Sequence, residues 1–410
     1  MSAAPRTGLI LTGGGSRAAY QVGVLRAIAR IRRDVGAGST NPFPIICGTS
    51  AGAINAAALA CGCDDFDAAV DAIESVWSNF HAEQVYRADS LGVIRSGARW
   101  LTMLSIGWAL TRWRRARPRS LLDNTPLEAL LERLVPLARL PLMLRGRHLQ
   151  ALAISASSYS SGQHVTFYQS RRLITPWTRS QRIAVRSRIT AAHLLASAAI
   201  PFVFPAVPLT LQGEGEWFGD GSMRQAAPIS PAVHLGADRV LVVGAGRMHE
   251  PPGRRPATPG YPNLAQIAGH ALSNIFLDAL AVDVERLTRI NNTLALLPAE
   301  ARARTSLRSI EVLVIAPSQR LDDLAALHLD SLLRPVRALL RGVGVSGRGP
   351  DVRGAALASY LLFEAPFTRA LMALGEADTL VRREDVERFF GWSRAVDQGT
   401  PVPLRLVTSQ

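Results

Sequence analysis

Lysine is absent from this chain. All 46 basic residues are therefore arginines, and with 32 acidic residues they give a formal net charge of +14. Such one-sided usage, in a chain rich in alanine, glycine and proline, fits a genome-wide compositional bias as well as a selected surface. The charge alone therefore does not indicate nucleic acid, and we expect no nucleic-acid partner. A peripheral surface of anionic lipid fits the charge equally well.

Cysteine is also scarce, with only Cys47, Cys61 and Cys63 in 410 residues. An odd number in a long chain excludes a disulfide framework, and the C-x-C pair has no nearby histidines to complete a zinc site. We expect three buried, reduced thiols, no metal and no cofactor. This cysteine usage predicts a cytoplasmic protein.

Long uninterrupted apolar runs are missing as well. Residues 45–63 carry no charge but include several glycines and polar residues, and prolines break residues 190–212. The first residues contain no apolar stretch of the length that a signal peptide needs. The sequence therefore predicts neither a signal peptide nor a transmembrane helix.

What is present is an alternation of apolar strands and amphipathic helices. Residues 8–12 and 44–47 are expected strands, each followed by an expected helix, at 16–33 and 51–60. This alternation is typical of βαβ units and a parallel sheet. Further expected elements are strands at 149–155, 164–168, 239–243 and 310–315, a long helix at 264–297 interrupted near Asn291, and a helical tail at 355–390. We expect a main domain at 1–320 and a mostly helical C-terminal extension at 321–410 packed on it.

Residues 85–125 differ in character from the rest of the chain. Their centre, 100–111, is uncharged and contains two tryptophans, and arginines flank it on both sides. Such a segment fits a lid or a membrane-facing insertion. An ordinary core helix ending in a basic turn fits it equally well.

The strongest chemical signal is the G-x-S-x-G pattern of Gly48, Ser50 and Gly52, placed between an expected strand and an expected helix. In that context the glycines let the backbone turn sharply, and the serine hydroxyl is presented at a helix N-terminus as a nucleophile. The alternative for a short motif of this kind is a tight turn without chemistry.

A second signal is the run Gly13, Gly14 and Gly15 between the first strand and its helix. Successive glycine amides can form a concave nest for an anion, either a cofactor phosphate or a transient oxyanion. A dinucleotide site would need an acidic residue at the end of the second strand, but that strand leads into the serine motif. The oxyanion interpretation is therefore favoured. Arg17 is a candidate for orienting this loop or contacting a phosphate, and the alternative is a solvated or ion-paired arginine.

The third signal is Asp220 followed by Gly221, which could be no more than a turn. None of the eight histidines lies in an obviously catalytic loop after a strand. A carboxylate on a glycine-flanked turn could instead accept the proton of Ser50 directly.

Together, residues 12–17, 48–52 and 220–222 resemble the motifs of the patatin-like phospholipase family, as do 196–201 and 228–240. The resemblance implies a three-layer α/β/α fold with a mostly parallel central sheet and a serine lipid acyl hydrolase with a Ser50–Asp220 dyad. It also implies that Gly13, Gly14 and Gly15 form the oxyanion hole. Ala18 and Ser222 depart from the usual family pattern, both conservatively.

The expected reaction is hydrolysis of a carboxylic ester of a phospholipid or related lipid, as in a phospholipase A, a lysophospholipase or an esterase, through an acyl-enzyme. Two alternatives stay open. A lipid acyltransferase would use the same dyad with another acceptor, and a lipid-binding scaffold would keep the fold without turnover.

Overall fold

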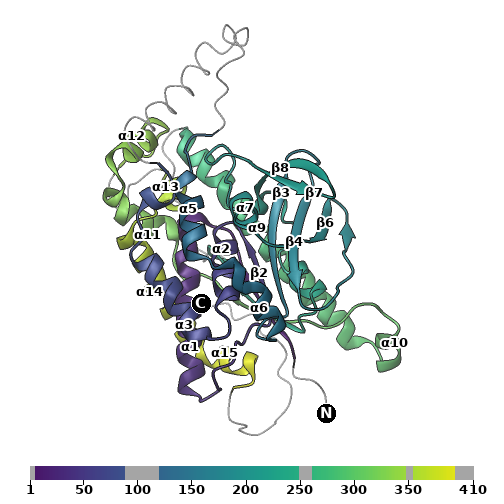
Figure 1. Cartoon of the computed structure of the whole chain (residues 1–410). Coiled ribbons are helices and arrows are strands. Elements are labelled where there is room, and N and C mark those ends of the chain that lie inside the picture. The colour runs from purple at the N-terminus through teal and green to yellow at the C-terminus, as the bar shows by residue number, and fades with distance from the viewer. Residues whose placement is uncertain (1–4, 88–119, 249–260, 348–353, 393–410) are drawn as a thin grey trace.

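A mixed sheet of ten strands forms the centre of the structure, a computed structural model that describes residues 5–87, 120–248, 261–347 and 354–392 (Figure 1). The strands are β1 (Thr7–Leu11), β2 (Ile45–Thr49), β3 (Ala151–Ser158), β4 (His164–Ser170), β5 (Thr178–Arg179), β6 (Arg182–Arg186), β7 (Val207–Leu211), β8 (Glu214–Asp220), β9 (Arg239–Val243) and β10 (Glu311–Ile315).

The sheet has a parallel half and a mixed half. Its strand order is β10-β9-β1-β2-β3-β4-β6-β5, and β8 also pairs with β3 and β7. Strands β10, β9, β1, β2 and β3 are parallel to one another, whereas β4 and β8 run antiparallel to β3. The expected mostly parallel sheet is confirmed. The sequence patterns do not predict β5, β6 or the β7–β8 hairpin.

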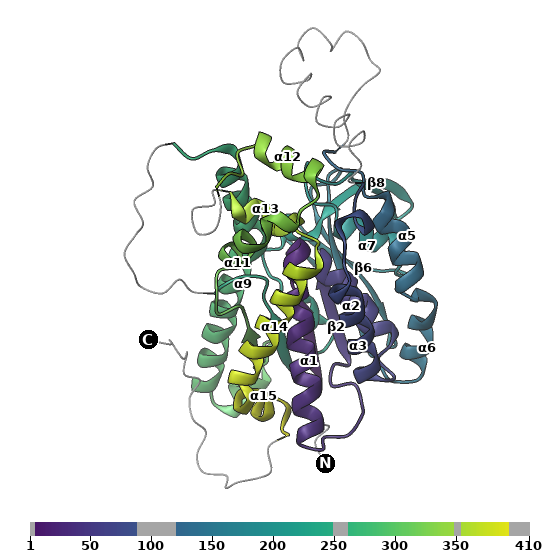
Figure 2. The ribbon, with the colours of Figure 1, turned by 90° about the vertical axis from the view of Figure 1, so that its left-hand side faces the viewer.

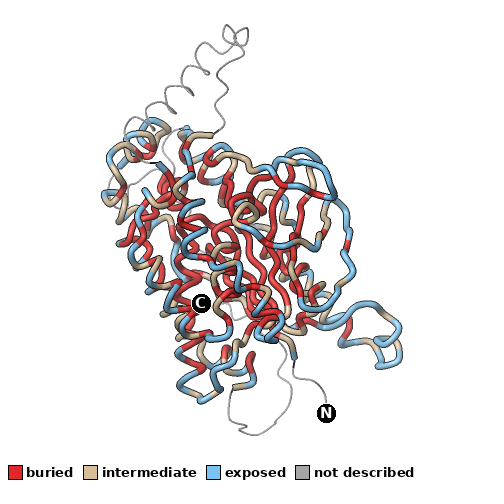
Figure 3. Tube along the Cα trace, viewed as in Figure 1, coloured by how far each residue is buried: buried red, intermediate tan, exposed pale blue. Residues whose placement is uncertain are grey.

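Both faces of the sheet are covered, because successive strand residues point to opposite sides. In β1, Leu9 and Leu11 belong to one hydrophobic cluster while Ile10 belongs to another, and β9 alternates in the same way. The larger cluster packs under α1, α2, α3 and α14, which lie in front of the sheet in Figure 2, and the smaller packs under α8 and α9. Figure 3 shows the strands buried between these layers. The three-layer α/β/α fold is therefore confirmed.

The helices are as follows: α1 (Ala19–Asp34), α2 (Ala51–Cys61), α3 (Phe66–Ser78), α5 (Thr125–Leu134), α6 (Leu140–Arg145), α7 (Ala191–Ser197), α8 (Ser230–His234), α9 (Leu264–Leu296), α10 (Ala299–Ala303), α11 (Leu321–His328), α12 (Arg334–Gly342), α13 (Ala355–Leu361), α14 (Ala365–Val381) and α15 (Arg383–Phe390). Short 3-10 turns are η1 (Gly15–Ala18), η2 (Ala82–Gln84), η3 (Leu137–Arg139), η4 (Gly221–Arg224) and η5 (Leu329–Ser331).

The C-terminal helices pack closely on the sheet domain. Gly23 of α1 and Gly375 of α14 let the two helix backbones meet, since a Cβ on either would lie under 3.0 Å from a carbonyl oxygen of the other helix. The expected helical C-terminal tail is thus present and packed. The boundary at residue 320 stays a prediction.

Helix α9 runs for 33 residues without the interruption expected near Asn291. The Asn291 side chain both donates to the carbonyl and accepts from the amide of Ile310, at 2.8 and 3.1 Å, so it docks the helix beside β10. Within the described ranges α9 is also the one helix long and apolar enough to cross a membrane, with a mean hydropathy of 1.3. Asp283, halfway along, accepts a hydrogen bond from the Ile229 amide.

Most of the segment 85–125, with its expected lid or membrane-facing insertion, lies outside the described residues. The three cysteines are free and buried, as expected.

Candidate active site

The strand register brings the three sequence motifs to one edge of the sheet. Leu11 of β1 lies opposite Gly48 of β2, so the glycine loop and Ser50 both follow the carboxyl ends of neighbouring parallel strands. On the other side, Ala156 of β3 pairs with Asp220 at the end of antiparallel β8. Ligands of open α/β sheets bind beyond the carboxyl ends of the strands.

Ser50 occupies a sharp turn between β2 and α2. Its φ of 56° lies in the left-handed region that non-glycine residues rarely adopt, and the residue is only 1% exposed. A Cβ on Gly48 would lie under 3.0 Å from the carbonyl of Gly52, and one on Gly52 would meet the carbonyls of Leu11 and Thr12. Both glycines are therefore required for the N-terminus of α2 to approach the strands this closely.

A buried serine, whose role the sequence does not predict, stabilises this turn. The Ser197 hydroxyl accepts a hydrogen bond from the Ser50 amide at 2.9 Å and donates to the Ser155 carbonyl at 2.6 Å. Ser197 ends α7, in the block 196–201 that resembled a family motif. The motif was visible in the sequence, but its contact with Ser50 required the fold.

Asp220 is fully buried and lies close to Ser50. Burial raises the pKa of its carboxyl group to about 6, while hydrogen bonding from the Ser50 hydroxyl and from Ser222 opposes the rise. Oδ1 accepts the Ser222 amide at 2.9 Å. Oδ2 has no hydrogen-bond partner of ordinary length among the described residues, so the contact with the Ser50 hydroxyl is looser than a formed hydrogen bond. Catalytic hydrogen bonds in unliganded sites are often long in this way.

The backbone around Asp220 is held on both sides. Its amide donates to the Ala199 carbonyl at 3.0 Å. A Cβ on Gly221 would lie under 3.0 Å from the carbonyl oxygen of Ser155, so only glycine lets this turn reach β3. The Asp220–Gly221 turn is thus built into the sheet and is not a free hairpin tip.

Gly15 of the glycine loop lines the same cavity as Ser50. Within the described part of the chain, the amides of Gly13, Gly14 and Gly15 donate no hydrogen bond. Successive backbone amides without an internal partner can bind an anion. On its inner side the loop is anchored by Gln21, whose amide donates to the Thr12 carbonyl at 2.7 Å.

An apolar cavity of about 370 Å³ opens beside Gly15 and Ser50. It runs between α2, α3 and α5, and nearly all its walls are hydrocarbon. Its lining includes Ile54, Ala58, Ile73, Val76, Trp77, Leu127, Leu131 and Phe363. A cavity of this lining suits an alkyl chain.

Within the described ranges, no histidine forms a hydrogen bond with Ser50 or Asp220, and no cluster of His, Cys, Asp or Glu has the arrangement of a metal site. Burial lowers the pKa of His164 and of His193 to about 4. Arg17 is not among the residues that line the cavity, and it is buried against α11 and α13.

A sequence model described as "Patatin-like phospholipase" matches residues 9–233, which is more than half of the chain and includes the glycine loop, Ser50 and Asp220. The chain belongs to the patatin-like phospholipase family. Membership in this family supports lipid hydrolase activity and a lipid substrate. No curated protein matches the sequence.

Among solved structures, this family member resembles VipD from Legionella pneumophila, at 14% identity and a TM-score of 0.32, over 91% of this chain and 67% of VipD. It also resembles the type III effector ExoU, at 16% identity and a TM-score of 0.27, over 97% and 91% of the two chains. ExoU of Pseudomonas aeruginosa in complex with SpcU gives 16% identity and a TM-score of 0.25, over 91% and 71%. These scores are too low to relate individual residues.

Proposed function

We propose that this chain is a serine lipid acyl hydrolase in which Ser50 is the nucleophile and Asp220 the general base. The observation that carries the proposal is the meeting of the Ser50 hydroxyl with a buried carboxylate, beside free glycine amides and an apolar cavity. These are the groups that acyl transfer needs: a nucleophile, a base, an oxyanion site and a place for the acyl chain.

In the first half of the reaction, Asp220 accepts the Ser50 proton as Ser50 Oγ attacks the ester carbonyl. The carbonyl oxygen becomes an oxyanion, stabilised by the amides of Gly13, Gly14 and Gly15 and by the N-terminus of α2. When the tetrahedral intermediate collapses, the carbon–oxygen bond to the alcohol breaks. The protonated Asp220 then gives its proton to the leaving alkoxide, and the acyl group stays on Ser50.

In the second half, Asp220 takes a proton from water, and the hydroxide oxygen attacks the acyl-enzyme. The same amides stabilise the second oxyanion. Its collapse releases the fatty acid, and Ser50 Oγ recovers its proton from Asp220. A pKa of about 6 suits this role, because the carboxylate is charged at neutral pH yet protonates readily during turnover.

The acyl chain would extend into the cavity between α2, α3 and α5, with the ester at its mouth beside Ser50. The arginine excess favours an anionic phospholipid surface as the place where substrate is met. Co-sedimentation with anionic vesicles tests whether the segment 85–125 binds a membrane surface. If it does, vesicle binding should weaken when Trp100 and Trp108 are replaced by alanine.

The central test is turnover of short- and long-chain acyl esters and of phospholipids by wild type, Ser50→Ala and Asp220→Asn. We expect both variants to lose activity by about a thousandfold or more. Ser75→Ala and Asp71→Asn, two exposed positions on α3, are matched controls that should retain it. Full hydrolysis by Ser50→Ala would overturn the proposal.

Product analysis with an added alcohol acceptor separates hydrolysis from acyl transfer. Free fatty acid as the main product supports the hydrolase, whereas acylated acceptor as the main product would make the chain an acyltransferase. Substrate binding without turnover in the wild type would favour a lipid-binding scaffold.

A further inference from the structure

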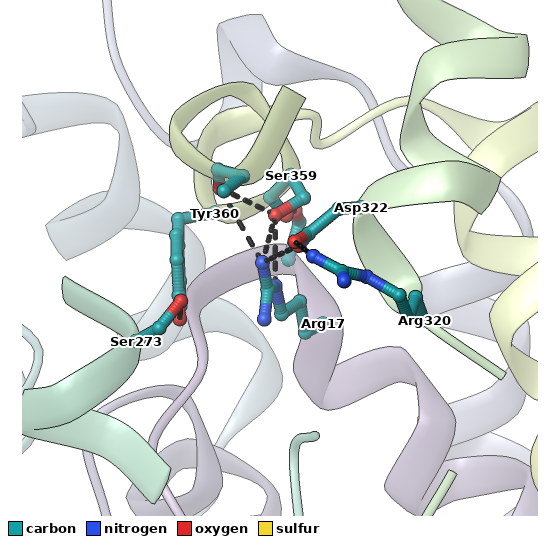
Figure 4. A network of polar contacts seen from close by, with 8 residues as sticks. Arg17, Ser273, Arg320, Asp322, Ser359 and Tyr360 are labelled. Atoms are coloured by element: carbon teal, nitrogen blue, oxygen red, sulfur yellow. Dashed lines mark hydrogen bonds and ion pairs between the residues drawn. The ribbon is translucent and has the colours of Figure 1, made fainter. Parts of the chain in front are cut away.

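Arg17 is a buried cation whose partners all come from the far end of the chain. Its Nε donates to the Ser359 hydroxyl at 2.8 Å, and Nη2 forms an ion pair with Asp322 at 2.5 Å (Figure 4). The guanidinium also lies over the Tyr360 ring, 4.0 Å from its centroid. The Arg17 side chain is only 3% exposed, so this arrangement satisfies a charge that would be costly to bury alone.

The two residues before Arg17 contact the same helix. The Ser16 hydroxyl donates to the Ser359 carbonyl at 2.6 Å. Gly15, with a φ of 56°, lies so close to the Tyr360 carbonyl that a Cβ would come under 3.0 Å from it. Three successive residues of the glycine loop and η1 thus rest on α13, and Asp322 adds α11 as a second support.

This support lies outside the span that the family model matches, which ends at residue 233. A loop of three glycines has more conformational freedom than any other tripeptide, so its amides need outside contacts to stay aligned. Oxyanion stabilisation depends on donors that are already in place before the reaction.

We propose that Asp322 and Ser359 are positioning residues for catalysis, acting through Arg17 to hold the glycine loop in its oxyanion-binding geometry. The inference rests on the proposed function, and it assigns the C-terminal helices α11 and α13 to the active site. It also gives Arg17 an orienting role, because Ser359 and Asp322 already occupy the Nε and Nη2 groups of its guanidinium.

The test compares Asp322→Asn, Ser359→Ala and the conservative Asp322→Glu, with Asp323→Asn as control. Asp323 is the exposed neighbour on the same helix. With a soluble short-chain ester, kcat should fall about tenfold or more in Asp322→Asn and Ser359→Ala while KM changes little. Asp322→Glu should recover part of the loss, and Asp323→Asn should match wild type.

A second readout does not depend on turnover. Hydrogen exchange of a peptide covering residues 9–20 should accelerate in Asp322→Asn and Ser359→Ala, while exchange in α2 stays unchanged. Faster exchange with no measurable hydrolysis by wild type would support the role of Asp322 and Ser359 in holding the glycine loop and would overturn the proposed function. Unchanged exchange, or faster exchange with wild-type kcat, would overturn the positioning role. A rise in KM confined to phospholipids would instead indicate that Arg17 contacts phosphate.

Discussion

The indole N–H of Trp77 donates a hydrogen bond to the side-chain carbonyl of Asn55 at 2.9 Å. Asn55 in turn donates to Gln21 at 3.0 Å, and Gln21 holds the Thr12 carbonyl. A chain of buried amides therefore connects α3 through α2 and α1 to the first peptide of the glycine loop. Because a peptide unit is planar, fixing the Thr12 carbonyl also fixes the direction of the Gly13 N–H.

Trp77→Phe should lower the free energy of unfolding by about 1–3 kcal/mol, because it leaves the buried Asn55 carbonyl without a donor. Urea unfolding measures this directly. Trp217→Phe, at a side chain that is 51% exposed, is the matched control and should change stability little. Equal effects of the two substitutions would contradict a structural role for the amide chain.

Activity should depend on pH through Asp220, whose pKa is raised to about 6 by burial. The base works only when charged, so kcat/KM should fall about tenfold per pH unit below about pH 6. A profile of ester hydrolysis between pH 4.5 and 8 checks this. A flat profile across that range would rule out a carboxylate with this pKa as the base.

The free energy of unfolding should also depend on pH through Asp220, but it should fall with rising pH where activity rises. Between its ordinary pKa of 3.8 and about 6, the folded chain keeps the Asp220 proton that the unfolded chain releases, so stability declines as pH rises through this window. At pH 8 Asp220→Asn should be more stable than wild type, by up to about 3 kcal/mol. The gain should shrink at pH 5, whereas Asp71→Asn should show none at either pH.

Gly215, near the start of β8, and Gly221, directly after its end, should respond very differently to alanine. Gly221→Ala places a Cβ against the Ser155 carbonyl, so the Asp220 turn must shift and activity should fall at least about tenfold. Gly215→Ala, at the other end of the same hairpin, meets nothing within 4 Å. Its kinetics and thermal unfolding should match wild type, and a similar loss in both variants would contradict the steric argument.

The cavity should set the length of acyl chain that is accepted. Ala58 lies about two turns beyond Ser50 on α2 and lines the cavity. Ala58→Phe should therefore reduce kcat/KM for long-chain esters by about tenfold or more while short-chain esters react as before. Assays of wild type and variant on a series of esters of increasing chain length measure the ratio of kcat/KM for long-chain to short-chain substrates. An equal loss at all lengths would place the acyl chain elsewhere.

Local sequence patterns predicted much of the fold and of the candidate site. Glycine is required by the local backbone at Gly48, Gly52 and Gly221, and the run of three glycines is equally distinctive, so these motifs can be recognised from residue type alone. The alternation of strands and helices predicted the parallel sheet. Asn291 shows where such reasoning fails. A turn-forming residue was expected to interrupt α9, but its hydrogen bonds to Ile310 make it useful inside an unbroken helix.

The sequence by itself determined the central βαβ units and the sharp turn at Ser50. Only the tertiary structure decided that Ser197 would hold the Ser50 amide, that burial would raise the pKa of Asp220, and that Asp322 and Ser359 would enclose Arg17. The physical reason is sequence separation. Turn chemistry acts over a few residues, whereas these contacts join residues 147 to 342 positions apart, and only packing brings such groups together.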